Sequence, residues 1–435
     1  MIWKQVQLGL IHVAVAMTLV PINSTLNRVM IKELAISATL VAILASLPYL
    51  FSPIQVAIGS FSDRHPIGGY RRSPYILIGV LLCVLGLIIS PQAAFLLYSN
   101  FWVGVVVGVF AFGAWGMGYN LASVSYLSLA TEISGTRNRG RTIAVMWFMM
   151  ITSIIFTAIT LSNLIDPYTE QALINAFWVV AGIALALGLI GLYRLEDRHV
   201  LPSSTEEGEQ YSWLFLLKTI RKNPQVTRFF WYLAILLAAI LGQDILLEPF
   251  AAEAFGLSVR DTTRITSIWG TFVLVALIAA GILENRFTKK LVVKLGAWIA
   301  LVGFLIITLS GFLQNLPVFY GGVVLLGVGT GLSTVSNLSL MFEMTTAEQV
   351  GLFIGAWGMS NAISRLIGTV LSGAVRDILT QLLQNPVNAY LVVFVIEAGM
   401  LAISLLLLRG IDVKVFRQQV EKQSLVERAA MATDI

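Results

Sequence analysis

The chain has 435 residues, of which 57% are hydrophobic and only 12% are charged. A soluble protein carries about 25% charged residues, so the composition excludes a soluble globular protein. The net charge is +5, which we expect to reflect membrane topology rather than nucleic-acid binding. Cys83 is the one cysteine, and an internal disulfide or a cysteine-based metal site is therefore excluded.

Apolar runs recur along the whole sequence at the length, about 20 residues, at which a helix crosses a hydrocarbon core. The first run begins almost at Met1 and has no signal-peptide cleavage site, so we expect a retained membrane helix. The pattern predicts an all-α polytopic membrane protein. Its twelve spans are expected near residues 5–26, 36–60, 74–95, 100–130, 141–162, 174–194, 226–247, 263–284, 292–313, 318–343, 352–376 and 388–408.

The basic residues indicate how the spans are oriented. With a cytoplasmic N-terminus, most of the 28 Lys and Arg residues fall on the cytoplasmic side, as the positive-inside rule requires. We therefore predict that both termini are cytoplasmic. Residues 196–225 are hydrophilic, with an acidic first part. Their second part has a composition that suits an interfacial helix or simply the lead-in to the seventh span.

Two stretches of the sequence resemble each other. Residues 113–132 and 324–343 share Val, Ser, Leu, Ser, Leu and Glu at matching places near their ends, with a constant offset. Such a repeat predicts two six-helix bundles related by an axis along the membrane normal. We expect an N-terminal bundle at 1–195, a linker at 196–225, a C-terminal bundle at 226–410 and a cytoplasmic tail at 411–435.

The loop between the second and third spans is a polar island between apolar segments. It contains Gly-x-x-x-Asp63-Arg64, a Gly-Gly turn, and then Arg71-Arg72-x-Pro-Tyr-Ile. This pattern resembles the signature of the major facilitator superfamily. Its elongated form is similar to that of the PucC and LhaA family of photosynthetic bacteria and cyanobacteria, as is the run from Glu132 to Arg141.

The resemblance implies a major facilitator fold that binds its ligand between the two halves. It further implies a protein that binds or delivers chlorophyll and assists assembly of chlorophyll-binding light-harvesting or photosystem complexes. The expected partners are the lipid bilayer, chlorophyll or a related tetrapyrrole, and chlorophyll-binding membrane proteins. The expected location is a thylakoid or the plasma membrane of a photosynthetic bacterium or cyanobacterium. Any metal would be the magnesium that the pigment carries, with no metal site intrinsic to the chain.

Charged residues at the cytoplasmic helix ends predict a gate. Glu132 and Glu343 stand at the ends of the two repeats. The expected partners of Glu132 are Arg64, Arg71 and Arg72, and those of Glu343 are Arg286, Lys289 or Lys290. Asp63 is expected to face the start of the eleventh span, where backbone N–H groups favour an anion. These contacts are predicted to join the two halves, and a pigment or ion role for either glutamate is the alternative. The predicted gate comprises Asp63, Arg64, Arg71, Arg72, Glu132, Arg139, Arg141, Arg286 and Glu343.

Charges inside the membrane are costly and therefore informative. Arg365 and Glu397 lie at about the same depth in the last two spans, given a rise of about 1.5 Å per residue. We predict that they pair. The pair is either a structural bridge or a means for Glu397 to bind a chlorophyll magnesium, which accepts oxygen ligands, or a polar head group.

Five further polar residues are weaker candidates. His12 could ligate a chlorophyll magnesium, although a lone membrane histidine more often bonds a neighbouring helix. Asp244 aligns with Asn23 and could line a cavity near the outer surface. The asparagines either line a cavity or form interhelical hydrogen bonds: Asn120, Asn337 and Asn361.

The chain contains no nucleotide-binding, zinc-protease or nucleophile-elbow motif, so an enzyme is not expected. Two hypotheses remain. The first is a pigment-handling assembly factor, and the second is a proton-coupled secondary transporter of a small organic solute.

Overall fold

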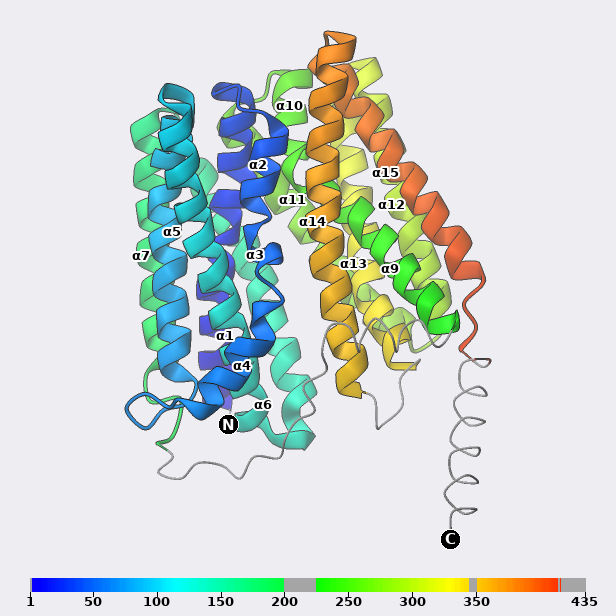
Figure 1. Cartoon of the computed structure of the whole chain (residues 1–435). Coiled ribbons are helices and arrows are strands. Elements are labelled where there is room, and N and C mark those ends of the chain that lie inside the picture. The colour runs from blue at the N-terminus through cyan, green and yellow to red at the C-terminus, as the bar shows by residue number, and fades with distance from the viewer. Residues whose placement is uncertain (1, 199–223, 344–349, 414, 416–435) are drawn as a thin grey trace.

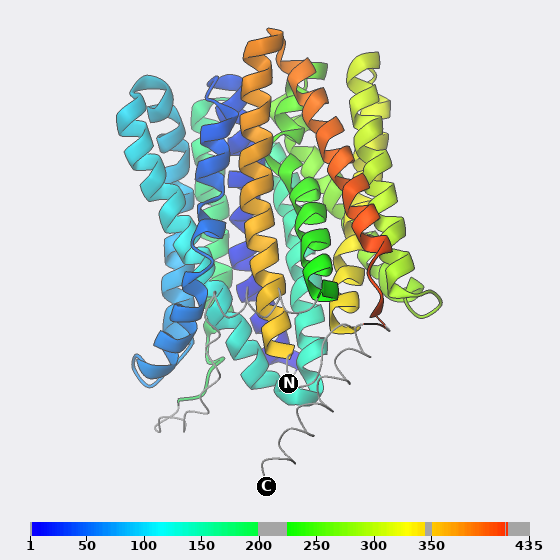
Figure 2. The ribbon, with the colours of Figure 1, turned by 45° about the vertical axis from the view of Figure 1, so that its right-hand side comes forward.

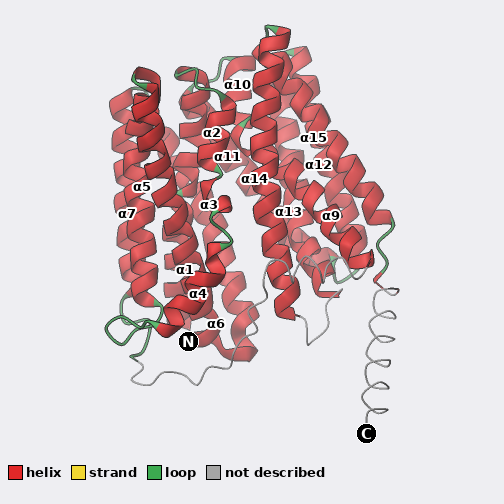
Figure 3. Cartoon of the chain, in the orientation of Figure 1, coloured by secondary structure: helices red, strands yellow, loops and turns green. Residues whose placement is uncertain are grey.

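The computed structural model describes residues 2–198, 224–343, 350–413 and 415. Within these ranges the chain is almost entirely helical, which confirms the predicted all-α membrane fold (Figure 3). Long helices run roughly parallel in two groups (Figures 1 and 2). We call the face where α1 begins and α15 ends the terminal face, and the opposite one the far face.

The first group of helices contains residues up to 192. Its first span, α1, continues through two π-helical segments, and its second is broken into three pieces. Its elements are α1 (Ile2–Met17), η1 (Pro21–Leu26), η2 (Val29–Glu33), α2 (Ala38–Ala45), α3 (Leu47–Leu50), α4 (Ile54–Arg64), α5 (Ser73–Ser99), α6 (Phe101–Leu164) and α7 (Glu170–Leu192). The long α6 comprises two spans that meet at a kink, where Gly135 has a positive φ of 61°.

The second group of helices follows the linker. Its elements are α9 (Pro224–Gly242), η3 (Gln243–Ile245), α10 (Leu247–Phe255), α11 (Val259–Leu283), α12 (Lys289–Leu313), α13 (Leu316–Glu343), α14 (Val350–Leu383) and α15 (Pro386–Arg409). The predicted interfacial helix of the linker falls on residues 199–223, which lie outside the described part of the chain.

Eleven helices among the described residues are long and apolar enough to cross a membrane. The predicted span at 36–60 is the one that is not a continuous helix. Pro48 and Pro53 interrupt it because proline lacks an N–H group and cannot extend the ladder of hydrogen bonds. Asn120 of α6 compensates by donating from Nδ2 to the Pro48 carbonyl at 2.8 Å. A backbone carbonyl at the break is therefore hydrogen-bonded to a side chain of a neighbouring helix.

Close helix contacts recur at matching places in the two groups. A Cβ atom added at Gly118 of α6 would lie 2.5 Å from the Gly79 carbonyl oxygen of α5. One added at Gly329 of α13 would lie 2.5 Å from the Ala300 nitrogen of α12. Gly118 and Gly329 occupy equivalent positions of the sequence repeat, and both let neighbouring backbones touch. The sequence repeat therefore corresponds to equivalent close contacts between helices in the two groups.

Two helix pairs make the most extensive contacts between the groups. The second span of α6 packs against α11, and α2 packs against α14. Gly270 of α11 faces Ile155 of α6, and Gly373 of α14 faces the Ala38 backbone of α2. The boundary between the two halves is therefore formed by the fifth and eighth spans and by the second and eleventh, which correspond under the repeat.

Candidate functional site

An ion pair of the second half lies at the boundary with the first half, within two membrane spans. Arg365 of α14 places Nη1 3.0 Å from Oδ2 of Asp244, in the short helix η3. The Arg365 guanidinium also lies over the ring of Tyr49 from α3, 5.1 Å from its centroid. The two charged side chains are 29% and 22% exposed. We call Tyr49, Asp244 and Arg365 the central site, because both halves contribute to it and it remains partly accessible.

The predicted pair between Arg365 and Glu397 is wrong. Glu397 of α15 is 1% exposed and accepts a hydrogen bond of 2.9 Å from Ser372 of α14. Its Oε1 also lies against Gly242 of α9, so Glu397 sits inside the second half. Equal depth did not determine the partner of Arg365. The break between α9 and α10 brings Asp244 to the side of α14 that faces the other half.

The remaining intramembrane candidates lie in packed surroundings. His12 is buried, with its ring 5.0 Å from that of Tyr126 and 6.3 Å from that of Trp147. Its Nδ1 has no hydrogen-bond partner among the described residues. A pigment-ligand role for His12 therefore stays a prediction.

The asparagines Asn120 and Asn337 form interhelical hydrogen bonds. Asn120 binds the backbone of the broken second span and accepts from Gln55. The Tyr232 hydroxyl of α9 donates to Oδ1 of Asn337 on α13 at 2.7 Å. Asn361 lies on α14 one turn before Arg365 and is half-buried. Of the three, Asn361 is the one nearest in sequence to the central site.

The glutamates at the ends of the repeats bind the predicted cations. Oε1 of Glu132 lies 3.1 Å from Nη2 of Arg72, and its Oε2 lies 3.6 Å from Nη2 of Arg71. Oε1 of Glu343 lies 2.9 Å from Nζ of Lys289. In both cases the partner belongs to the same half as the glutamate. The predicted partners are thus confirmed, but these pairs do not join the halves, because each loop folds back onto its own bundle.

The other predicted gate residues are less constrained. Arg64, Arg141 and Arg286 are exposed. The side chains of Asp63 and Arg139 lie outside the described part of the structure. The predicted contact of Asp63 with the start of the eleventh span therefore stays a prediction.

Glu196 holds the 65–72 loop and was missed by the sequence analysis. Its Oε1 accepts from the backbone N–H of Arg71 at 2.8 Å, and its Oε2 from that of Ser73 at 2.6 Å. A carboxylate at this place satisfies N–H groups that the first turn of α5 leaves unpaired. The sequence shows an acid shortly after the sixth span, but not which backbone it binds.

Asp377 of α14 holds the start of α2 across the boundary between the halves. Its carboxylate accepts from the N–H groups of Ala38 at 3.1 Å and Thr39 at 2.8 Å, and from the Thr39 hydroxyl at 2.6 Å. Arg376 lies 3.0 Å from this carboxylate and 3.1 Å from that of Glu253 in α10. The sequence pattern did not predict this cluster either, although an Arg-Asp pair stands at the end of the predicted span 352–376.

A second group of contacts closes the same face. The Ser24 hydroxyl of η1 donates to Oε1 of Glu248 in α10, and Thr266 of α11 donates to the same oxygen at 2.7 Å. The hydroxyls of Thr25 and Thr263 are 3.0 Å apart. Together with the Asp377 cluster, these contacts form what we call the far-face seam. Alternating access requires one face to close around the site, and here the far face is closed.

Several solved structures that superimpose on this chain are transporters. A bacterial homologue of the human lysosomal transporter Spinster, in an inward-facing and unoccupied conformation, superimposes with a TM-score of 0.74 over 96% of this chain and 97% of that one, at 13% identity. The nucleoside transporter NupG gives a TM-score of 0.72 over 94% and 98%, at 15% identity. The chain thus has the major facilitator fold.

Relatives that match most of the chain at higher identity come from photosynthetic bacteria. Protein PucC of Cereibacter sphaeroides is 32% identical over 93% of this chain and 91% of that protein. A protein of Rhodobacter capsulatus named the bacteriochlorophyll synthase 44.5 kDa chain is 26% identical over 94% and 95%. The family model described as PUCC protein matches residues 25–416. The chain therefore belongs to the PucC family.

Proposed function

We propose that this protein binds or delivers chlorophyll and assists the assembly of chlorophyll-binding light-harvesting or photosystem complexes. The match of the PucC family model to residues 25–416 carries this proposal. The relative named a bacteriochlorophyll synthase chain adds a link to the pigment. In this role the protein is not itself an enzyme, and the chlorophyll is its cargo.

The central site is where we propose that the cargo contacts the chain. Ligands of major facilitator proteins bind between the halves near mid-membrane. Tyr49 presents a flat ring there. Arg365 has N–H groups that can donate hydrogen bonds to a keto or ester oxygen at the edge of a macrocycle. Asp244 balances the Arg365 charge, so that the site can take a ligand without net charge.

We place the protein in a photosynthetic membrane, with both termini on the cytoplasmic side. The terminal face carries the loop with Arg64, Arg71 and Arg72, and such clusters stay on the cytoplasmic side of membrane proteins. In that orientation the far-face seam closes the side away from the cytoplasm. Chlorophyll-binding membrane proteins would then meet the chain within the bilayer or from the cytoplasm.

A secondary transporter of a small organic solute is the second candidate. The closed far-face seam and the ion pair at the boundary between the halves favour it, because carriers use such a site in alternating access. Proton-driven uptake of a solute into vesicles that contain the purified protein would support this candidate, and its absence would favour pigment handling.

The proposal is tested in the native photosynthetic host. We expect inactivation of the gene to lower the amount of assembled chlorophyll–protein complexes, and the native gene to restore it. The charge-neutral double variant Arg365→Gln/Asp244→Asn should be inserted in the membrane but should not restore assembly. Unchanged complexes after inactivation would contradict the assembly role, and full rescue by the double variant would remove the central site from it.

A further inference from the structure

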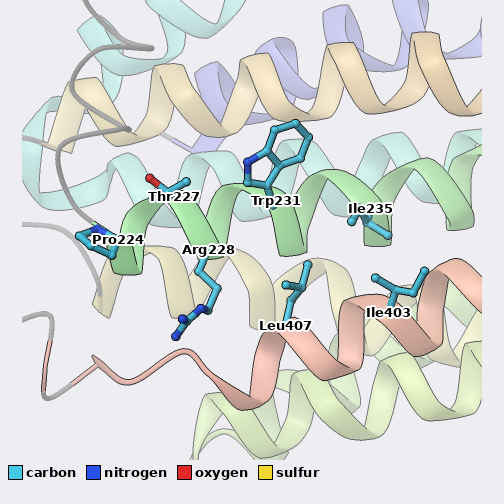
Figure 4. Close-up of a pocket in the computed structure, with 7 residues that line it drawn as sticks. All are labelled: Pro224, Thr227, Arg228, Trp231, Ile235, Ile403 and Leu407. Atoms are coloured by element: carbon cyan, nitrogen blue, oxygen red, sulfur yellow. The ribbon is translucent and has the colours of Figure 1, made fainter.

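A groove lies on the surface between α9 and α15, outside the central site (Figure 4). Its volume is about 640 Å³, within the range of about 300–1,000 Å³ found for ligand sites. One wall is a single face of α9, and Ile403 and Leu407 of α15 form the other. From this groove we infer a binding site for an anionic phospholipid.

Most of the groove is lined by apolar side chains. Trp231 and Ile235 of α9 line it together with Ile403 and Leu407 of α15 (Figure 4). Trp231 is 57% exposed and Ile403 is 51% exposed, although both lie on helices that cross the membrane. The side chains of Trp231 and Ile403 therefore face the hydrocarbon of the bilayer. This part of the groove suits an acyl chain that lies along the helices.

One end of the groove is polar. Arg228 and Thr227 line it near the start of α9, seven residues or about 10 Å along the helix from Ile235. The Arg228 guanidinium donates from Nη1 to the Gly410 carbonyl at the end of α15. That contact fixes its position, while its exposed guanidinium has further N–H groups for a second acceptor. A phosphate at this depth would meet a positioned cation.

The surroundings favour a head group with net negative charge. Lys290 donates to the carbonyls of Arg409 and Ile411, so Arg228 and Lys290 both lie at the end of α15. Asp412 is the nearby acid whose charge acts on Lys290. Basic residues at the membrane surface attract anionic lipids, each by about five-fold in affinity. A zwitterionic head group brings its own cation and gains less here.

Binding is measured with the full chain in nanodiscs of phosphatidylcholine that contain increasing amounts of phosphatidylglycerol with brominated acyl chains. A brominated chain that contacts Trp231 quenches its fluorescence, and Trp231→Phe gives the share of the signal that belongs to this residue. We expect saturable quenching of the Trp231 share by phosphatidylglycerol. Brominated phosphatidylcholine should need a concentration at least about five-fold higher.

Variants distinguish binding at a specific lipid site from attraction of anionic lipid by the overall charge of the protein surface. Arg228→Gln should weaken the quenching by phosphatidylglycerol about five-fold, whereas Arg194→Gln, at another exposed arginine of the terminal face, should leave it unchanged. Ile403→Phe fills the exposed groove without altering any charge or adding a tryptophan, and it should abolish saturation. Equal quenching by both lipids, equal effects of the two arginine variants, or saturation that survives Ile403→Phe would each overturn the inference.

Discussion

Arg365 and Asp244 bring a matched pair of charges into a region where an isolated charge is costly. The pair lies at a helix break and is covered by the Tyr49 ring of the opposite half. Removal of one partner leaves a largely buried charge uncompensated, whereas removal of both leaves none. The central site is therefore sensitive to single changes and tolerant of a matched double change.

We expect Arg365→Gln or Asp244→Asn alone to lower the free energy of unfolding in detergent by about 3 kcal/mol. The double variant should lose less than either single variant, and a double-mutant cycle measures that coupling. Arg286→Gln, at an exposed arginine, serves as the control and should cost less than about 1 kcal/mol. Additive losses from the two single changes would show that the ion pair does not form.

Glu196 stabilises the start of α5 through hydrogen bonds to backbone N–H groups. Its carboxylate accepts the N–H groups of Arg71, Arg72 and Ser73. Glu196→Ala should cost about 0.5–2 kcal/mol, as for the loss of a helix cap, and should speed hydrogen exchange at residues 71–73. Asp197→Ala removes only an exposed pair with Lys4 and should leave that exchange unchanged. Equal exchange in all three proteins would refute the capping role.

At the scale of elements, the far-face seam depends on short helices and their ends. The start of α2 finds its cap on α14, in the other half. We expect Asp377→Ala to weaken the seam. Spin labels at Glu170 and Gln381, which are exposed near the far face on either half, should show a broader and longer distance distribution in this variant. A distribution identical to that of the parent would contradict the role of Asp377.

Apolar runs were sufficient to predict the spans, because a membrane span needs only a run of about 20 apolar residues. The exception is the second span, where Pro48 and Pro53 stand inside an apolar run. Hydropathy does not register their missing N–H groups, and the hydrogen bond from Asn120 that supports the break comes from another helix. The partners of Glu132 and Glu343 could also be predicted, since they lie in the loops nearest to those helix ends.

At the scale of the whole molecule, the sequence could not tell which face is closed. The residues of the far-face seam, such as Asp377 and Glu248, acquire their partners only when the halves meet, and those partners are distant in the sequence. Depth along a helix was likewise insufficient to pair Arg365, because the rotation of each helix decides which side chains face each other. The two halves thus enclose a site whose composition only the assembled fold defines.

The claim that this PucC-family protein handles chlorophyll is tested most directly by its absorption spectrum after purification from the native photosynthetic membrane. We expect chlorophyll bound in a fixed ratio to the protein, and less pigment in the Arg365→Gln/Asp244→Asn double variant. The control is an unrelated membrane protein purified from the same membranes. A folded protein that carries no more pigment than this control, and that co-purifies with no chlorophyll-binding subunit, would contradict the account.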